Sequence, residues 1–268
     1  MVGKIRPSAQ LLEIFKSWKG GAIRMEKNTK LSTRLDIILD RPDKNNCLSG
    51  EMMEQFGQQA GKLSSHDNAI IVISGVGKSF CSGADLGLID DISKQSLGVE
   101  MFEYMSSILS RIHHSPSISI ANIHGHTLGG ATEICSSTDI RIAHSSSKIG
   151  FFQSKMGIVP SWGGAEYMEN IMGKGKALSV MCRANVMSAK DAKKLGWIDY
   201  VYENEEEAEK FINSIAHSGL EVTKAQKAML NAVKIGKNAQ KEVLERVWNG
   251  STHKKALQKQ LEAVVKKQ

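Results

Sequence analysis

The chain has 268 residues, of which 41% are hydrophobic, 24% charged and 6% aromatic. This is the composition of a folded protein with a sizeable core, in one large domain or two small ones, and it excludes disordered, collagen-like and fibrous classes. The net charge of +7 indicates an anionic partner. Nucleic acid, a phosphorylated cofactor and an acidic membrane are all open at this point, but no apolar run approaches the ~20 residues that span a bilayer.

Four cysteines are spread widely and form no C-x-x-C pair: Cys47, Cys81, Cys135 and Cys182. Their spacing favours buried free thiols in a reducing compartment over a zinc site or a disulfide framework, so no metal is expected. The first residues lack the apolar core of a signal peptide, and Leu11 to Trp18 predicts a short amphipathic helix. We expect a cytoplasmic protein, with a mitochondrial location as the alternative.

In chain order, the first two thirds contain isoleucine-rich segments of strand length. They are Arg34–Asp40, Asn68–Ser74, Ser117–Ile123 and Asp139–His144. Helical patterns lie between them, at about 49–64, 98–113 and 128–138. Strands that alternate with helices indicate βαβ units and a largely parallel sheet, so the fold class is α/β.

Strand patterns become rare after residue 160. Ser188 and Asp191 have the spacing of a capping box, which opens a short helix that Gly196 ends. From about residue 205 to the end the pattern is helical, with an apolar stripe at Leu257, Leu261, Val264 and Val265. This stripe is equally consistent with core packing and with a subunit contact. We therefore expect a core over residues 1–200 and a helical region over 201–268 that serves oligomerisation and covers the pocket.

A glycine-rich segment, S-G-V-G-K-S-F-C-S-G-A-D-L, follows the second predicted strand from Ser74 to Leu86. A P-loop would need its first glycine at position 72, which is Val72. A dinucleotide fingerprint would need a glycine at Phe80. Because both patterns lack a required glycine, kinase, NTPase and NAD-enzyme functions are disfavoured.

A second glycine-rich segment, I-H-G-H-T-L-G-G-A-T-E, follows the next strand and ends at Glu133. Gly129 and Gly130 open a predicted helix, whose first N–H groups lack partners within the helix. Such groups can stabilise a developing oxyanion, and Gly83-Ala84-Asp85 offers a second site of this kind. The alternative is that both are turns without a function.

Together these segments resemble the crotonase (enoyl-CoA hydratase/isomerase) superfamily in order and spacing. The run K-M-G-I-V-P-S-W-G-G, Lys155 to Gly164, adds to the resemblance, which covers about residues 20 to 268. It implies a crotonase-like spiral of βαβ units with a helical C-terminal region, and a homo-oligomer, either a trimer or a hexamer. It also implies an acyl-CoA thioester as the substrate, with no cofactor beyond the coenzyme A that the substrate carries.

The resemblance assigns roles to residues of this chain. The backbone N–H groups of Ala84 and Gly130 would bind the thioester oxygen, and Ser82 would meet the adenine of CoA. Neighbouring Gly83 and Gly129 would shape the two turns. Asp85 is expected to cap or brace its loop, while Trp162 either walls the acyl pocket or packs in the core.

Two positions decide which chemistry the resemblance implies. Glu133 matches the first of the two glutamates of a hydratase, whereas the second position holds Gln153. Because glutamine cannot take or give a proton in this role, ordinary hydration of an enoyl-CoA is disfavoured. Glu166 and Glu169 in the next helix have the wrong spacing to substitute for it and are expected to be solvated.

Decarboxylation of a malonyl-type thioester needs a stabilised enolate and one acid, and the sequence retains both. Within the superfamily, the chain most resembles the decarboxylases of ethylmalonyl-CoA, through M-G-I-V-P-S-W-G-G, S-F-C-S-G-A-D-L, K-S-W-K-G-G-A-I and V-W-N-G. We therefore expect a lyase acting on ethylmalonyl-CoA, with methylmalonyl-CoA as a second substrate. An ionised Glu133 would repel the substrate carboxylate, so either burial raises its pKa or repulsion helps to expel CO₂.

Two alternatives stay open: an enoyl-CoA hydratase or isomerase, and an RNA-binding protein on the same fold. No basic stretch is interleaved with aromatic residues, so we expect no nucleic-acid partner. Residues 237–268 contain eight Lys and Arg against three Glu, or +5 of the net charge. The phosphates of CoA are then the expected anionic partner. His124 and His126 are expected to be loop residues rather than proton donors, and His113-His114 lacks partners for a metal site.

Overall fold

The computed structural model describes residues 6–63 and 67–265, so residue 64 of the predicted helix 49–64 and the last three residues of the C-terminal helical pattern lie outside it. The strands are β1 (Ala22–Lys27), β2 (Arg34–Asp40), β3 (Ile70–Gly75), β4 (Ile118–Ile123), β5 (His126–Leu128), β6 (Ile140–His144), β7 (Lys148–Gly150), β8 (Val186–Ser188) and β9 (Tyr200–Tyr202). The helices up to residue 200 are α1 (Ala9–Ser17), η1 (Pro42–Lys44), α2 (Gly50–Lys62), α3 (Leu86–Lys94), α4 (Gly98–His113), α5 (Gly130–Ser137), η3 (Gln153–Met156), α6 (Gly164–Met172), α7 (Lys174–Arg183) and α8 (Ala189–Leu195). The remaining helices are α9 (Glu205–Ile215), α10 (Leu220–Ile235), α11 (Lys237–Val247) and α12 (Ser251–Val265).

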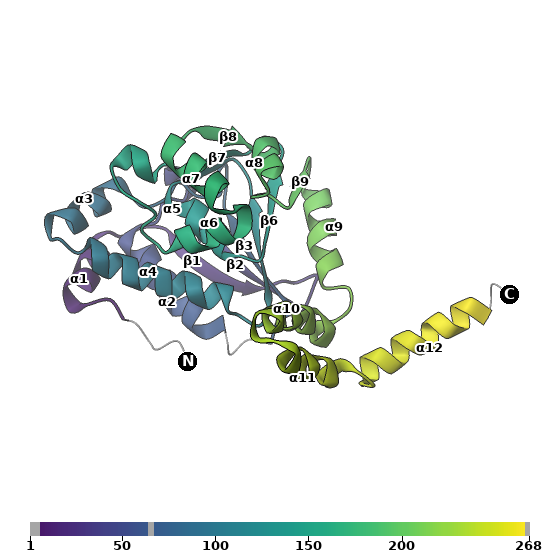
Figure 1. The fold of residues 1–268 in the computed structure, drawn as a ribbon. Coiled ribbons are helices and arrows are strands. Elements are labelled where there is room, and N and C mark those ends of the chain that lie inside the picture. Colours follow the sequence, from purple (N-terminus) through teal and green to yellow (C-terminus); the bar gives the residue numbers. More distant parts are fainter. Residues whose placement is uncertain (1–5, 64–66, 266–268) are drawn as a thin grey trace.

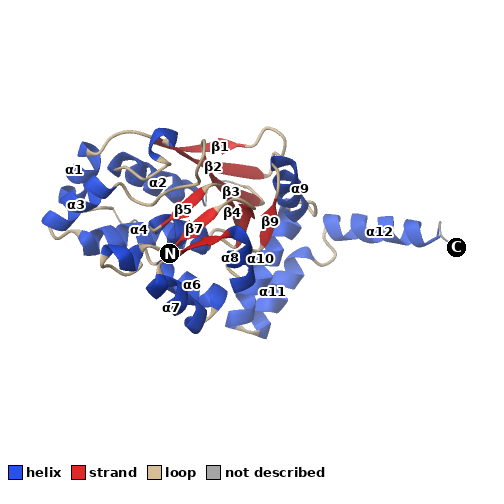
Figure 2. Ribbon diagram, turned by 90° about the horizontal axis from the view of Figure 1, so that it is seen from above, coloured by secondary structure: helices blue, strands red, loops and turns tan. Residues whose placement is uncertain are grey.

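The main sheet has six strands in the order β1-β2-β3-β4-β6-β9. Within this sheet, neighbouring strands run parallel from β2 to β9, which confirms the predicted βαβ organisation. Only the edge strand β1 is antiparallel to its neighbour. A smaller sheet, β5-β7-β8, lies beside it (Figure 2). The sequence pattern missed β1, whose side chains are mostly half-buried or exposed, and also the three-residue strands, which are too short to show a period.

Alternation along the parallel strands divides the core between the two faces of the sheet. Ile71 and Ile73 of β3 belong to the large core that includes α1, α2, α4, α5 and α6. Ile70 and Val72 face the other way, into a smaller core with Ala208 and Ile212 of α9. Figure 1 shows α9 beside the sheet at its β9 edge. Strands that are buried on both faces account for the continuous isoleucine and valine runs in the sequence.

The four cysteines differ in how deeply they are buried. Cys81 and Cys135 are buried as expected, Cys47 is half-buried, and Cys182 is exposed. The expectation of four buried thiols is therefore wrong for Cys182, which lies in the outer helix α7. All four are free cysteines.

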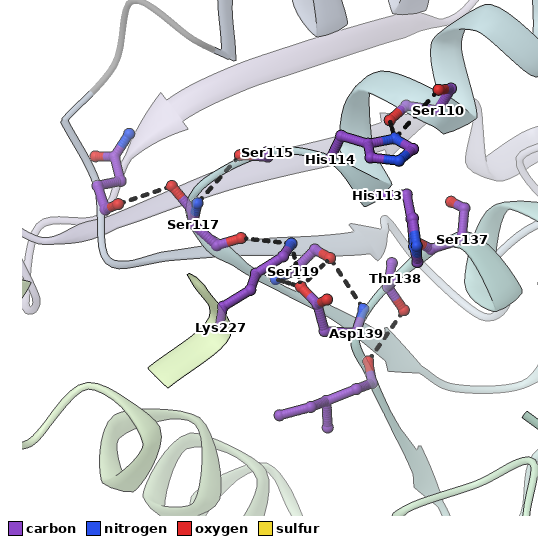
Figure 3. Close-up of polar contacts among 12 residues, drawn as sticks. Ser110, His113, His114, Ser115, Ser117, Ser119, Ser137, Thr138, Asp139 and Lys227 are labelled. Atoms are coloured by element: carbon purple, nitrogen blue, oxygen red, sulfur yellow. Dashed lines mark hydrogen bonds and ion pairs between the residues drawn. The ribbon is translucent and has the colours of Figure 1, made fainter. Parts of the chain in front are cut away.

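Helix α10 is attached to the amino-terminal ends of β4 and β6 by a buried ion pair (Figure 3). The Nζ of Lys227 donates to Oδ2 of Asp139 at 2.7 Å and to the carbonyl of Ser117 at 3.0 Å. The same carboxylate oxygen accepts from the N–H of Ser119 at 2.7 Å and from its hydroxyl at 2.8 Å. A buried lysine of this kind is stable because its charge is paired with a carboxylate and its ammonium group is hydrogen-bonded.

The last described helix, α12, projects away from the rest of the chain (Figures 1 and 2). The apolar stripe lies on it and is exposed, with Leu257 at 50%, Leu261 at 59%, Val264 at 56% and Val265 at 70%. Core packing within the chain, one of the two explanations open for the stripe, is therefore contradicted by the structure. Across residues 6–63 and 67–265, no helix combines the length and the apolar character that crossing a membrane requires.

The short helix α8 has the ends that the sequence predicts. The hydroxyl of Ser188 accepts from the N–H of Asp191 at 3.1 Å, and Gly196 ends the helix with φ at +89°. This left-handed backbone favours glycine, which explains why the helix stops there.

Candidate active site

The two glycine-rich turns lie side by side at the ends of β3 and β5. The N–H of Cys81 donates to the carbonyl of His126, and the N–H of Leu128 donates back to Cys81, both at 3.1 Å. A Cβ placed on Gly83 would lie 3.0 Å from the carbonyl oxygen of Leu128 and 3.4 Å from the nitrogen of Gly130. Glycine at 83 therefore allows the first turn to approach the second at backbone distance.

Both turns present an N–H group without an acceptor in the described residues. Leu48 bonds to the residues on either side of Ala84. Its N–H donates to the carbonyl of Gly83 at 2.8 Å, and its carbonyl accepts from the N–H of Asp85 at 2.9 Å. The N–H of Ala84 is left without an acceptor. In the second turn the N–H of Gly129 donates to the carbonyl of Gly150 at 2.9 Å, and Gly130 opens α5 with its own N–H unused. Two adjacent free donors are what an oxyanion requires.

Glu133 lies one turn into α5 and is completely buried, with no exposed surface. Its Oε2 accepts from the N–H groups of Trp162 and Gly164, both at 2.8 Å. Its Oε1 accepts from the N–H of Ser161 at 3.1 Å and from Nε2 of Gln153 at 3.0 Å. The carboxylate is thus held at the amino-terminal end of α6, where backbone donors and the helix dipole favour negative charge.

The sequence explains why this shell forms. Gly163 has φ at +84°, which turns the backbone into α6. A Cβ on Gly164 would lie 2.5 Å from Cγ of Glu133 and 2.9 Å from Oε2, so only glycine lets the N–H approach the carboxylate. The S-W-G-G run therefore encodes a binding site for the side chain of Glu133, a role that its sequence pattern alone does not indicate.

Burial and hydrogen bonding act in opposite directions on this carboxyl group. Burial raises the pKa of Glu133 above its usual 4.5, while the hydrogen bonds from Gln153, Gly164, Trp162 and Ser161 lower it. The net direction is upward. The pKa of Glu133 therefore lies closer to neutral pH than that of an exposed glutamate.

All nine residues predicted for the site line one cavity of about 780 Å³. They are Ser82, Gly83, Ala84, Asp85, Gly129, Gly130, Glu133, Gln153 and Trp162. Trp162 lines this cavity and is also packed in the core, with only 2% of its surface exposed. Further apolar lining comes from residues that sequence reasoning did not single out, although three of them lie within the quoted motifs: Ile89, Leu128, Phe152, Met156 and Ile158.

Asp85 caps and braces its loop, as expected. Its Oδ1 accepts from the N–H of Gly87 at 3.1 Å at the start of α3, and Oδ2 accepts from Arg41 at 2.8 Å. Arg41 and neighbouring hydrogen bonds lower the pKa of Asp85 against the opposing effect of its partial burial. Sequence reasoning missed Arg41, because it lies 44 positions before Asp85 in the chain.

The cavity lining does not include His124, His126, Glu166 or Glu169. His126 is exposed, and His124 contacts the carbonyl of Gly77 at 3.1 Å. Glu166 and Glu169 are exposed on α6, which agrees with their expected place as solvated helix charges. The described residues contain no group of three or more His, Cys, Asp or Glu side chains that could hold a metal ion.

Comparison with known proteins places this geometry in a family. The family model described as enoyl-CoA hydratase/isomerase matches residues 32–268. Ethylmalonyl-CoA decarboxylase of Xenopus laevis is 28% identical over 262 residues, covering 94% of this chain and 87% of that protein. The protein of that name from Rattus norvegicus is 29% identical over 263 residues, covering 93% and 87%.

Among solved structures, enoyl-CoA hydratase from Thermoplasma volcanium is similar to this chain with a TM-score of 0.79 and 28% sequence identity. The alignment covers 88% of this chain and 96% of that one. The motifs, the fold and the family match agree, and the chain belongs to the enoyl-CoA hydratase/isomerase family, the crotonase superfamily.

Proposed function

We propose that this protein is a lyase that decarboxylates a short malonyl-type acyl-CoA, with ethylmalonyl-CoA as the leading substrate. The observation that carries the proposal is the pairing of Glu133 with Gln153 beside two free N–H donors. This arrangement offers a site for an oxyanion and one ionisable carboxyl group. The names of the relatives from Xenopus laevis and Rattus norvegicus support the same reaction.

The reaction follows from these groups. The N–H groups of Ala84 and Gly130 hold the thioester oxygen, and the bond between the α-carbon and the carboxylate breaks. Its electron pair enters the thioester to give an enolate, and CO₂ leaves. The donors stabilise the charge that develops on the oxygen, where one such hydrogen bond contributes about 10²–10³ in rate. Glu133 then gives a proton to the α-carbon and recovers one from solvent.

The environment of Glu133 supports its role as the acid. Burial raises its pKa, which increases the share of the neutral form. A neutral Glu133 does not repel the carboxylate of the substrate. Of the two explanations open from the sequence, a raised pKa is therefore the one that we adopt.

The cavity can hold both parts of the substrate. Apolar side chains such as Phe152 and Trp162 surround the acyl end, and Lys44 lines the same cavity and supplies a cation for a CoA phosphate. Ser82 is the proposed neighbour of the adenine. One methylene separates ethylmalonyl-CoA from methylmalonyl-CoA, and an apolar pocket distinguishes such a pair by about 1–3 kcal/mol. We therefore propose activity on both.

The exposed stripe on α12 supports a homo-oligomer, either a trimer or a hexamer. A helix whose described residues include none that are buried leaves its apolar side uncovered in the single chain. Light scattering should give a multiple of the 29.3 kDa chain mass. Leu261→Asp should reduce the mass, and Gln260→Asp, which adds the same charge beside the stripe, should not. An unchanged mass for Leu261→Asp would contradict this assembly.

The function is tested by offering the purified protein ethylmalonyl-CoA and crotonyl-CoA separately and identifying the products by mass. We expect CO₂ and butyryl-CoA from the first and little hydration of the second, because Gln153 cannot serve as the second acid or base. Hydration of crotonyl-CoA without loss of CO₂ from ethylmalonyl-CoA would replace the proposal with an enoyl-CoA hydratase. Isomerase activity and salt-sensitive RNA binding are the remaining alternatives to assay with the same preparation.

A further inference from the structure

The carboxylate of Glu133 has no lone pair left for a proton in the arrangement described. An ionised carboxylate offers about four acceptor positions, two on each oxygen. Glu133 fills two on Oε2 with the N–H groups of Trp162 and Gly164, and two on Oε1 with Ser161 and Gln153. Protonation therefore requires that one of these four donors leaves.

The four donors differ in their freedom to move. Three are backbone N–H groups fixed by the turn into α6, whose geometry depends on Gly163 and Gly164. Only Gln153 donates through a side chain, and a rotation about its last bond exchanges the amide nitrogen and oxygen. The proton must then bind to Oε1, because both donors to Oε2 belong to the backbone.

The oxygen of the same amide is unpaired. Gln153 is 6% exposed, and its Oε1 is buried without a hydrogen-bond partner in the described residues. A buried acceptor without a donor is unfavourable, and structures rarely retain one without a reason. After rotation this oxygen would face Glu133 and accept the hydrogen of the neutral acid.

We propose that Gln153 is a positioning residue whose side-chain amide rotates as Glu133 gains and loses its proton. With Glu133 ionised, Nε2 donates to the carboxylate. With Glu133 neutral, Oε1 of Gln153 accepts from its O–H. The inference deepens the proposed function, on which it rests, because the acid that protonates the enolate changes its charge in every turnover. A glutamate at position 153 could not donate to an ionised Glu133 unless it carried a proton of its own.

Other charged groups near this pair are exposed or engaged elsewhere. On the elements that pack against α5, the nearby titratable groups include Glu166 and Glu169, exposed on α6; Tyr167 of α6, whose pKa burial raises to about 12; Lys155, exposed on η3; His126, exposed on β5; and His113 of α4, which contacts the carbonyl of Ser137. Across the cavity they include Lys44 and Asp90, which are exposed, and Cys47 and Asp85, which both contact Arg41. The donors that contact the carboxylate of Glu133 are therefore the groups that determine how its proton is held.

Infrared difference spectroscopy of the protein without substrate tests the rotation directly. The carboxyl band of neutral Glu133 is assigned by its loss in Glu133→Gln, and the side-chain amide band of Gln153 by its loss in Gln153→Met. We expect the amide carbonyl band to move to lower frequency at the pH where the carboxyl band appears, because the oxygen gains a donor. A carboxyl band that titrates while the amide band stays unchanged would overturn the proposal, whether or not the protein decarboxylates ethylmalonyl-CoA.

Turnover provides a second measurement. Gln153→Met removes the donor to the ionised form and the acceptor for the neutral form, and the bond to the charged form is the stronger one. The loss of activity at high pH should therefore move upward by about one pH unit. Ser154→Ala is the matched control, because Ser154 lies in the same turn but bonds to the carbonyl of Met181 at 2.8 Å. An unshifted pH profile in Gln153→Met would count against the proposal, whereas absence of CO₂ release by the unaltered protein would count against the proposed function.

Discussion

The indole ring of Trp162 lies directly against Gly130, so that a Cβ on this glycine would be 2.5 Å from ring atom Cζ3. The same tryptophan gives its backbone N–H to Glu133 at 2.8 Å. One residue therefore contacts both the proposed oxyanion donor and the proposed acid. This contact fixes the distance between the two groups on which an enolate would depend.

Gly130→Ala should separate these groups. The first residue of a helix ordinarily tolerates alanine, which favours helix by up to about 1 kcal/mol over glycine. Here the added methyl group collides with Trp162, so we expect CO₂ release from ethylmalonyl-CoA to fall by about 10²-fold or more with the circular dichroism spectrum retained. Gly175→Ala in α7 is the control, since a Cβ there meets nothing within 4 Å. Equal activity in both variants would contradict the role of the second turn.

Glu133→Gln should remove the acid and preserve the pocket. The amide has nearly the shape of the carboxylate and can still accept from Trp162 and Gly164, but it cannot give a proton to an enolate. We expect decarboxylation to fall by about a hundredfold or more. Product formation followed by mass spectrometry measures the change, and near-normal turnover would refute the assignment of Glu133.

The raised pKa of Glu133 also predicts how stability depends on pH. The folded chain binds this proton more tightly than the unfolded chain, in which the pKa is near 4.5. The stabilisation from this group is therefore complete below about pH 4.5 and is lost as the pH rises through the folded-state pKa. Urea unfolding from about pH 4 to about pH 8 should show the stability of the unaltered protein falling relative to Glu133→Gln. If the unaltered protein instead gained stability relative to Glu133→Gln as the pH rises, the hydrogen bonds to the carboxylate would outweigh the effect of its burial.

The fold was predictable where sequence periodicity is strong. The strand at Arg34–Asp40 and the helix ending at His113 have their predicted bounds, because each buries a continuous apolar face. The pairing of Arg41 with Asp85 was not predictable, since it depends on how η1 and α3 come together in space. The exposure of the stripe at Leu257 was not predictable for the same reason, because an amphipathic pattern identifies an apolar face but not what packs against it.

The candidate site shows the same division between local and long-range information. The glycine pattern identified both turns, and the resemblance to the crotonase superfamily identified Glu133 and Gln153, because each belongs to a short continuous segment. The three backbone donors to Glu133 come from a segment 28 to 31 residues later in the chain. They carry no side-chain signature, and only the absence of a Cβ at Gly164 marks their presence in the sequence.

The buried ion pair between Lys227 and Asp139 should be essential for the attachment of α10. The two side chains are 7% and 23% exposed, so removing one partner leaves a charge with little water around it. Lys227→Met should lower the free energy of unfolding by about 3 kcal/mol or more. Adding Asp139→Asn to this variant should restore part of the loss, because the second change removes the unpaired carboxylate. Urea unfolding of both single variants and the double variant measures the coupling, and strictly additive losses would show that the two charges do not depend on each other.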